Sequence, residues 1–119
     1  MSIQNTLIID KKANFYKDVF ELVMLIPEGR VTSYGTIAKY LGATRSSRLV
    51  GWAMNLSHTH DQYIPAHRVV NRQGLLTGKM HFPTPTTMEE LLNAEGVIVI
   101  NDQVQNFDKI FWDPFIELG

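Results

Sequence analysis

The chain has 119 residues, 45% of them hydrophobic and 19% charged, so it can bury one core and is too short for two. That composition excludes a disordered chain, and no apolar run reaches the roughly 18 residues of a membrane-spanning helix. The sequence has no cysteine, which excludes disulfides, thiolate metal ligands and a thiol nucleophile. We therefore expect one untargeted domain over residues 1–119, with no metal, no cofactor and no membrane partner.

The net charge of −1 conceals a segregation of charge along the chain. Residues 30–79 hold seven lysines and arginines against the single acid Asp61, whereas residues 80–119 hold seven acids against the single base Lys109. If the fold keeps these segments apart, the basic one can form a surface for a phosphate backbone. If the fold mixes them, no such surface follows, and charge alone leaves both outcomes open.

The first predicted element is a helix over residues 15–26, whose apolar residues recur every three or four positions. Asn14 precedes the pattern as the predicted N-cap, and Gly29 lies where the pattern has stopped. A loop is expected over residues 28–31.

Two short helices are expected next. Thr32 and Ser33 are candidate caps of a helix over residues 34–40 that ends at Gly42. Two short helices joined by a turn that contains glycine are typical of a helix-turn-helix, although helical hairpins in proteins that do not bind DNA share this pattern.

The second of these helices is predicted to run from Arg45 to about residue 56, after Thr44 as its cap. Its buried face is predicted to carry Leu49, Leu56 and either Trp52 or Ala53.

The next segment is predicted to be extended. Pro65 favours extended angles in the residue before it, and β-branched residues follow, so we expect extended structure over residues 64–70. Residues 71–74 suit a turn, and residues 81–87, with two prolines and three threonines, suit an irregular connection.

The C-terminal third is predicted to contain a helix and a hairpin. Thr87 and Glu90 are spaced as a capping box, and Gly96 can close the helix that they begin. Residues 97–104 are expected to form a hairpin that turns at Asn101 and Asp102. Four aromatic residues of the tail are expected to pack onto the core: Phe107, Phe111, Trp112 and Phe115.

Several segments carry a family resemblance. Pro65–Val70 resembles the Pro-Cys-His-Arg-Val signature of O6-alkylguanine-DNA alkyltransferases, with Ala66 in place of the alkyl-accepting cysteine. Gly29–Ala38 resembles the segment that carries the family's DNA-contacting tyrosine, Arg48–Met54 resembles its recognition helix, and Leu91–Gly96 resembles the segment with a buried glutamate. These matches span about residues 15–100 in order. The chain therefore resembles the cysteine-free branch, the alkyltransferase-like proteins.

The resemblance implies a mainly α fold with short strands, namely the helix-turn-helix, winged-helix-like DNA-binding domain of the alkyltransferase C-terminal type. It also implies a protein that is not an enzyme. Such a protein binds O6-alkylguanine in double-stranded DNA from the minor groove, flips the nucleotide and flags the lesion for nucleotide excision repair. The implied partners are the damaged DNA and nucleotide excision repair proteins, and we expect a monomer that is cytoplasmic and nucleoid-associated, or nuclear in a eukaryote.

The resemblance also implies roles for single residues. Arg48 matches the arginine that fills the gap left by the flipped nucleotide. Tyr34, Ala66 and Val69 match members of the lesion pocket.

His67 and Glu95 match the proton relay that activates the family's cysteine. Without a thiol, we expect them to be a hydrogen-bonded pair with no catalytic role.

The remaining candidates are contacts to the DNA backbone. Thr32 and Ser33 could equally be plain helix caps, and for Arg68 a structural salt bridge is favoured over a phosphate contact. The candidates, chosen for charge, hydroxyl groups or small size, are Thr32, Ser33, Arg45, Ser46, Ser47, Gly51, Arg68, Arg72 and Lys79.

The sequence also departs from the family. Ser57 stands near where the family places a hinge asparagine, Leu76–Phe82 replaces a glycine-rich closing loop, and Trp52 stands where many relatives have glycine. Three alternatives compete with damage recognition: a sequence-specific helix-turn-helix regulator, an alkyltransferase inactivated by a designed cysteine-to-alanine change, and a lesion hydrolase with His67 as base. The hydrolase lacks the strong nucleophile that dealkylation needs.

Overall fold

A computed structural model describes residues 3–43 and 46–119, with side chains described from residue 13 onward. Thr44 and Arg45, predicted as a helix cap and a DNA contact, lie outside the described residues. The fold is mainly helical with short strands, as the resemblance implied. The helices are α1 (Ile3–Val23), α2 (Tyr34–Tyr40), α3 (Ser47–Leu56), α4 (Thr87–Ala94), α5 (Phe107–Ile110) and α6 (Pro114–Glu117). The strands are β1 (Thr32–Ser33), β2 (Val69–Val70), β3 (Val99–Ile100) and β4 (Gln103–Val104), and the 3-10 turns are η1 (Ser57–Thr59), η2 (Ala66–Arg68) and η3 (Lys79–His81).

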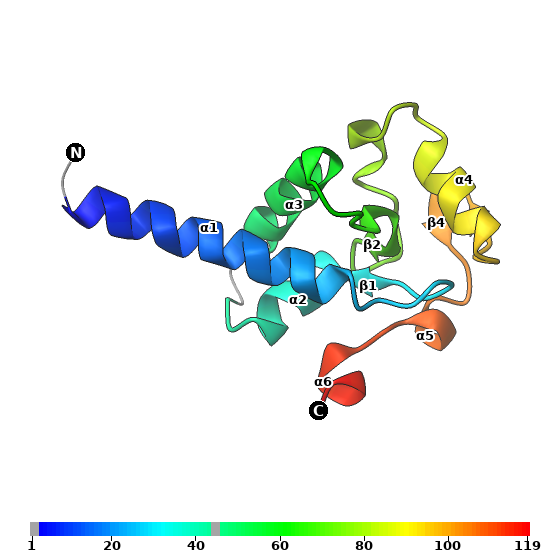
Figure 1. The fold of residues 1–119 in the computed structure, drawn as a ribbon. Coiled ribbons are helices and arrows are strands. Elements are labelled where there is room, and N and C mark those ends of the chain that lie inside the picture. The colour runs from blue at the N-terminus through cyan, green and yellow to red at the C-terminus, as the bar shows by residue number, and fades with distance from the viewer. Residues whose placement is uncertain (1–2, 44–45) are drawn as a thin grey trace.

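Helix α1 begins well before the predicted start. Asn14, the predicted N-cap, lies inside the helix, because the residues before it include neither proline nor glycine to stop it. Figure 1 shows that the N-terminal half of α1 extends away from the rest of the molecule. The buried residues Val19 and Leu22 lie in its C-terminal half, so this half belongs to the core. Among the described residues, no helix combines the length and apolarity that crossing a bilayer requires.

Helix α2 confirms its predicted caps. The Ser33 hydroxyl accepts a hydrogen bond from the backbone N–H of Thr36 at 3.2 Å, and Ser33 is the N-cap. At the other end, Gly42 adopts a φ of 77°, a left-handed conformation that favours glycine and ends the helix.

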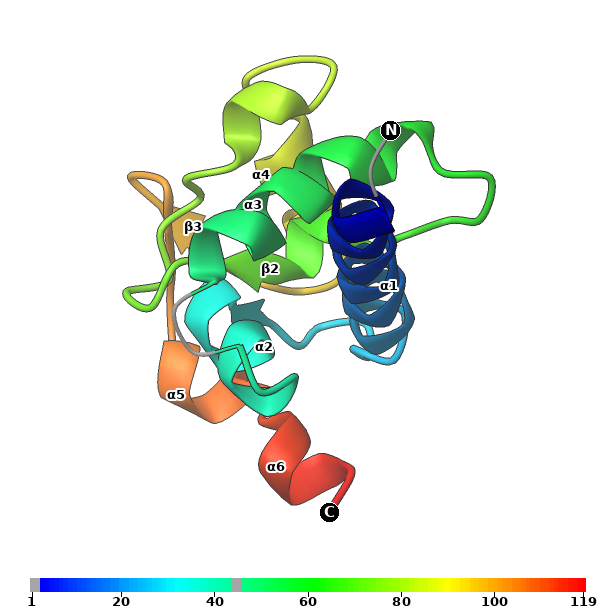
Figure 2. The same cartoon turned by 90° about the vertical axis from the view of Figure 1, so that its left-hand side faces the viewer.

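Helix α3 ends where predicted, and its buried face agrees with the prediction in part. It begins at Ser47, and its buried residues are Val50, Ala53 and Met54, whereas Trp52 and Leu56 are 47% and 50% exposed. Of the two alternatives for this face, Ala53 is confirmed, and Leu56 was wrong. The face is set by tertiary packing, because α1 and α2 both lie against α3 (Figure 2) and share a core cluster with Val50 and Ala53.

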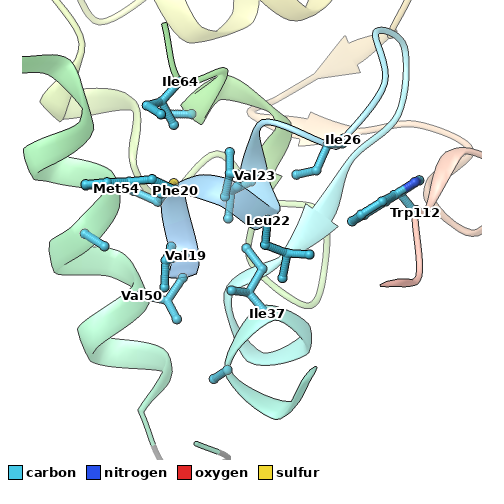
Figure 3. Close-up of a cluster of buried hydrophobic side chains, with 14 residues drawn as sticks. Val19, Phe20, Leu22, Val23, Ile26, Ile37, Val50, Met54, Ile64 and Trp112 are labelled. Atoms are coloured by element: carbon cyan, nitrogen blue, oxygen red, sulfur yellow. The ribbon is translucent and has the colours of Figure 1, made fainter. Parts of the chain in front are cut away.

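One core cluster joins the three helices to the C-terminal tail. Figure 3 shows Val19 and Leu22 of α1 facing Ile37 of α2 and Val50 of α3, with Trp112 at the edge. Trp112 is held there by its backbone N–H, which donates to the carbonyl of Val31 at 2.7 Å. Packing of the tail is thus confirmed for Trp112. Phe107 and Phe111 are half-buried, and Phe115 stays 47% exposed, with its ring edge-on to Tyr40.

Strand β1 was missed in the sequence. It pairs in parallel with β2, with Thr32 opposite Val69 and Ser33 opposite Val70. The expected extended segment before β2 contains a 3-10 turn instead, in which the Arg68 N–H donates to the carbonyl of Pro65 at 3.0 Å.

The predicted turn and hairpin of the C-terminal half are confirmed. Gly74 has a φ of 79° and donates to the carbonyl of Asn71 at 2.9 Å. Asn101 and Asp102 connect β3 to β4 with φ angles of 52° and 62°, the left-handed pair of a type I′ turn.

Helix α4 begins within one residue of the prediction, but the capping box was wrong. Thr87 is the first helical residue, and Thr86 is the N-cap, whose hydroxyl donates to the Glu90 carboxylate at 3.1 Å. Gly96 ends the helix with a φ of 85°, and the N–H of Val97 donates to the carbonyl of Leu92. This end fixes the position of Glu95, the C-cap.

Candidate nucleic-acid interface

A cleft of about 540 Å³ opens on the exposed face of α3. One wall is α3, the second is the first residue of α2, and the third is the segment around η3. The lining residues of this outer cleft are Tyr34, Ser47, Arg48, Gly51, Trp52, Asn55, Thr77, Gly78 and His81.

A much smaller space lies deeper and adjoins the outer cleft. It holds only about 10 Å³, the room of about one water molecule. The lining residues of this inner cavity are Tyr34, Gly51, Met54, His58, Ala66, Gly78, His81, Phe82 and Met88. Tyr34, Gly51, Gly78 and His81 line both spaces, so the outer cleft leads into the inner cavity.

Ala66 and Tyr34, two of the predicted pocket residues, both line the inner cavity. Val69, the third, is fully buried in the core and belongs to neither lining. Ala66 is 5% exposed, and its side chain is a methyl group with no nucleophilic atom. The structure thus brings together the tyrosine and the alanine. The role of Val69, which the resemblance gives to its backbone carbonyl and not to its side chain, stays a prediction.

The Tyr34 phenol is packed tightly against the segment before η3. A β-carbon added at Gly78 would lie 2.8 Å from the Tyr34 hydroxyl oxygen, so this approach needs glycine. Burial raises the pKa of Tyr34, and a hydrogen bond with Thr77 only partly opposes that shift. The phenol is therefore neutral, and it can both donate and accept a hydrogen bond.

Arg48 lies where the resemblance required, exposed on α3 and lining the outer cleft. Ser47 and Gly51 line the same cleft, so their small side chains leave this face of α3 open to close approach. Ser46 is the half-buried N-cap of α3, and Arg72 is exposed but lies in a different groove beside Phe107.

A buried polar cluster lies behind Ala66 and is centred on the Glu95 carboxylate. His67 Nε2 lies 2.7 Å from Glu95 Oε2, and the Arg68 guanidinium donates to both carboxylate oxygens, with its shortest contact at 2.6 Å. The N–H of Gly29 donates to Oε1 at 3.0 Å, and Arg68 Nη1 donates to the carbonyl of Ile26 at 2.8 Å. The cluster therefore ties α4, η2 and the end of α1 together.

The protonation states of this cluster follow from its contacts. Burial by itself would raise the pKa of Glu95, but hydrogen bonds from Arg68, His67 and Gly29 outweigh it and hold the pKa at about 2. Burial lowers the pKa of His67, and the hydrogen bond to Glu95 only partly opposes that shift. At neutral pH the imidazole is neutral, and its Nε2–H donates to an ionised carboxylate.

Burial decides the role of three candidate backbone contacts, and for Arg68 it confirms the favoured salt bridge. Arg68 is 8% exposed and its guanidinium is occupied by Glu95 and Ile26, so it is a structural link and not a phosphate contact. Thr32 is fully buried in β1, and Ser33 is 5% exposed with its hydroxyl committed to capping α2. The sequence could not separate a cap from a contact, because both need the same hydroxyl.

The charge segregation along the chain is partly cancelled in space. Lys79 Nζ lies 2.6 Å from the Asp102 carboxylate, and Arg30 donates to the carbonyls of Ile110 and Phe111 and lies 3.7 Å from Glu117. With Arg68 also paired, three of the basic residues of the middle segment are matched by acids of the C-terminal third. The broad basic surface is therefore replaced by separate exposed cations.

The sequence did not single out His58 and His81 for the inner cavity. They come from η1 and η3, and His58 stacks edge-on to Phe82 with ring centroids 4.6 Å apart. Burial and the nearby His81 both lower the pKa of His58. The resemblance pointed to the loop that contains His81 but gave no signal for which of its side chains face the cavity.

Comparison with known proteins shows which family this chain resembles. Residues 14–97 match the model of the DNA-binding domain of 6-O-methylguanine DNA methyltransferase. The chain is 32% identical over 105 residues to Alkyltransferase-like protein 1 of Schizosaccharomyces pombe, covering 84% of this chain and 95% of that one. It is 36% identical over 107 residues to the DNA base-flipping protein of Escherichia coli K12, covering 88% of this chain and 79% of that one.

A solved structure agrees with the sequence matches. The crystal structure of S. pombe Atl1 in complex with damaged DNA containing O6-carboxymethylguanine superposes with a TM-score of 0.74 at 32% identity. The match covers 86% of this chain and 97% of that chain. Sequence and fold thus agree over most of both chains.

Proposed function

The chain belongs to the family of the 6-O-methylguanine DNA methyltransferase DNA-binding domain, within its alkyltransferase-like branch, and we propose that it recognises O6-alkylguanine in duplex DNA without repairing it. The observation that carries this proposal is the methyl group of Ala66 in the wall of the inner cavity. Alkyl transfer needs a strong nucleophile at that place, and the chain has no cysteine at all.

The groups that surround Ala66 support binding rather than reaction. Tyr34 is held neutral by burial, and burial also keeps His58 from ionising readily. Neither group has the nucleophilicity of a thiolate, so an alkylated base that reaches the cavity stays chemically intact.

The shape of the site supports nucleotide flipping. An alkyl group on guanine O6 faces the major-groove side of a stacked pair, so a closed cavity can enclose it only if the nucleotide leaves the duplex. Arg48 stands at the mouth of the outer cleft, where its planar guanidinium can fill the vacated position. The exposed face of α3 then lies in the minor groove, whose degenerate code leaves selectivity to the cavity.

A protein that binds the lesion without removing it leaves the repair to other proteins. We propose that the bound protein marks the site for nucleotide excision repair proteins, and that it acts as a monomer. The support is chemical, because the lesion survives binding and needs a separate activity to excise it.

The test compares two short duplexes that are identical except for guanine or O6-methylguanine at one position. Affinity is measured at fixed salt, and the intact mass of the protein is recorded afterwards, since phosphate contacts make any affinity depend on salt. We expect tighter binding to the lesion and an unchanged mass. Equal affinity would reduce the chain to a general DNA-binding domain, and a gain of one methyl group would show that it is an alkyl acceptor.

A further inference from the structure

Trp52 is a large apolar residue that does not belong to the hydrophobic core. It lies on α3 one turn after Arg48, on the side of the helix away from the buried residues. Its side chain is 47% exposed and lines the outer cleft, and it is absent from the lining of the inner cavity. A large apolar surface is therefore presented at the mouth of the site.

The outer cleft is the path to Ala66. The cleft and the inner cavity share Tyr34 and Gly78, and the inner cavity has room for about one water molecule in this structure. The outer cleft, at about 540 Å³, is within the size range of ligand pockets. A nucleotide that moves toward the inner cavity must first occupy the outer cleft. Of the residues that line the outer cleft, Trp52 has the largest aromatic side chain.

We propose that Trp52 stacks on the extrahelical guanine while it occupies the outer cleft, before the alkylated edge reaches Ala66. The proposal rests on the proposed function, since it needs a flipped nucleotide. Arg48 and Trp52 then have separate roles. Arg48 fills the gap in the duplex, and Trp52 replaces the stacking that the extruded base has lost. Base–aromatic stacking changes affinity by about 5- to 150-fold per base.

A different role for Trp52 makes a different prediction. If the indole only lay against the sugars of the minor groove, it would contact damaged and undamaged DNA alike. A stacking partner for the extrahelical base strengthens binding only where a base is extruded. The ratio of the two affinities therefore separates the two roles.

The first experiment uses Trp52→Gly and Trp52→Phe, with Leu56→Ala as the control. Leu56 is 50% exposed on the same helix but lines neither space, so its loss tests the effect of removing exposed apolar surface from α3. We expect Trp52→Gly to weaken binding to the O6-methylguanine duplex about tenfold and to the guanine duplex less than twofold. Trp52→Phe should recover most of the loss, and Leu56→Ala should change neither affinity.

The second experiment follows Trp52 directly by fluorescence. The chain has two tryptophans, and Trp112 is buried at 3% exposure, so Trp112→Phe leaves Trp52 as the single emitter. Its emission should be quenched by the O6-methylguanine duplex and much less by the guanine duplex.

The outcomes distinguish this proposal from the proposed function. An equal loss of affinity for both duplexes on Trp52→Gly, or no quenching on a lesion that the protein still prefers, would overturn stacking and leave damage recognition intact. A wild-type protein without preference for the lesion would overturn both.

Discussion

At the scale of single residues, Ala66 carries the proposal of recognition without repair. Its methyl group faces the inner cavity, while His67, next in sequence, hydrogen-bonds to Glu95 behind it. The arrangement that would serve a thiol is thus present around a side chain that cannot react. One substitution, of Ala66 by cysteine, can test whether His67 and Glu95 still support alkyl transfer.

We expect Ala66→Cys to accept an alkyl group slowly from an O6-methylguanine duplex. The reason is that His67 is neutral, since burial lowers its pKa, and that Glu95 beside its Nε2 can stabilise the imidazolium formed when the ring takes the thiol proton. Intact-mass measurement over time would show a gain of one methyl group, with the wild-type chain as the control. Unchanged mass in a variant that still binds the lesion would mean that η2 does not aim the thiol at the alkyl carbon.

Arg48→Ala tests flipping at the same scale. Arg48 is exposed, so its removal should leave thermal stability unchanged. Binding to the lesion duplex should weaken about tenfold or more, because nothing then fills the vacated position. Arg72→Ala, which removes an exposed arginine outside both spaces, is the matched control at equal salt. Equal small losses for both variants would count against insertion of Arg48.

At the scale of elements, Glu95 is the point at which three segments meet. It is the C-cap of α4, and its carboxylate receives hydrogen bonds from η2 and from the backbone of Gly29 after α1. Losing its charge should therefore loosen the packing of α4 against the rest of the site.

Glu95→Gln should lower the free energy of unfolding by about 3 kcal/mol at neutral pH. The pKa of Glu95 falls from 4.5 to about 2 on folding, so its ionised form stabilises the fold fully above about pH 4.5 and progressively less as pH falls toward 2. Urea unfolding of both proteins between pH 7 and 2.5 would measure this. The wild-type curve should fall across that window more steeply than the variant's, and parallel curves would contradict the assignment.

Much of the fold was predictable at the element scale, because local signals decided it. The Ser33 side chain caps the start of α2, and the left-handed backbone of Gly42 ends it. Asn101 and Asp102 make the expected hairpin turn. The face of α3 was predicted only in part: Ala53 is buried, but Leu56 is exposed, since the apolar residues of the helix allow more than one buried stripe and the packing of α1 and α2 selects one. Strand β1 has only two residues, which is too short for an alternating apolar pattern to reveal it.

The site was predictable only where a motif named the residue. Tyr34, Arg48 and Ala66 come together around the two spaces as the resemblance implied. His58 and His81 were missed because their approach depends on the path of two loops. The salt bridge favoured for Arg68 is confirmed, whereas the role of Thr32 stayed open because a hydroxyl group says nothing of burial.

At the scale of the whole molecule, ion pairing limits the electrostatic contribution to DNA binding. Three basic residues of the middle segment are matched by acids of the C-terminal third. The described cations of that segment that lie exposed are Lys39, Arg48 and Arg72. Affinity for undamaged DNA should therefore depend only modestly on salt.

We expect the logarithm of the association constant to fall with the logarithm of salt concentration with a slope near −3, as about three phosphate contacts would give. If all seven basic residues of the segment bound phosphate, the slope would be about −6. Titrations between 50 and 200 mM salt would distinguish these values. A slope steeper than about −5 would show that the internal ion pairs open on DNA.

The near-closure of the inner cavity gives this molecule a resting state that excludes its own ligand. Binding then competes with an opening equilibrium, and the apparent dissociation constant rises in inverse proportion to the open population. On the proposed function, opening is equally unfavourable for every guanine that is presented, whereas an alkyl group would gain contacts with Met54, Phe82 and Met88, which line the cavity. Undamaged guanine would then dissociate sooner than alkylated guanine, and the longer lifetime of the complex would mark the damage.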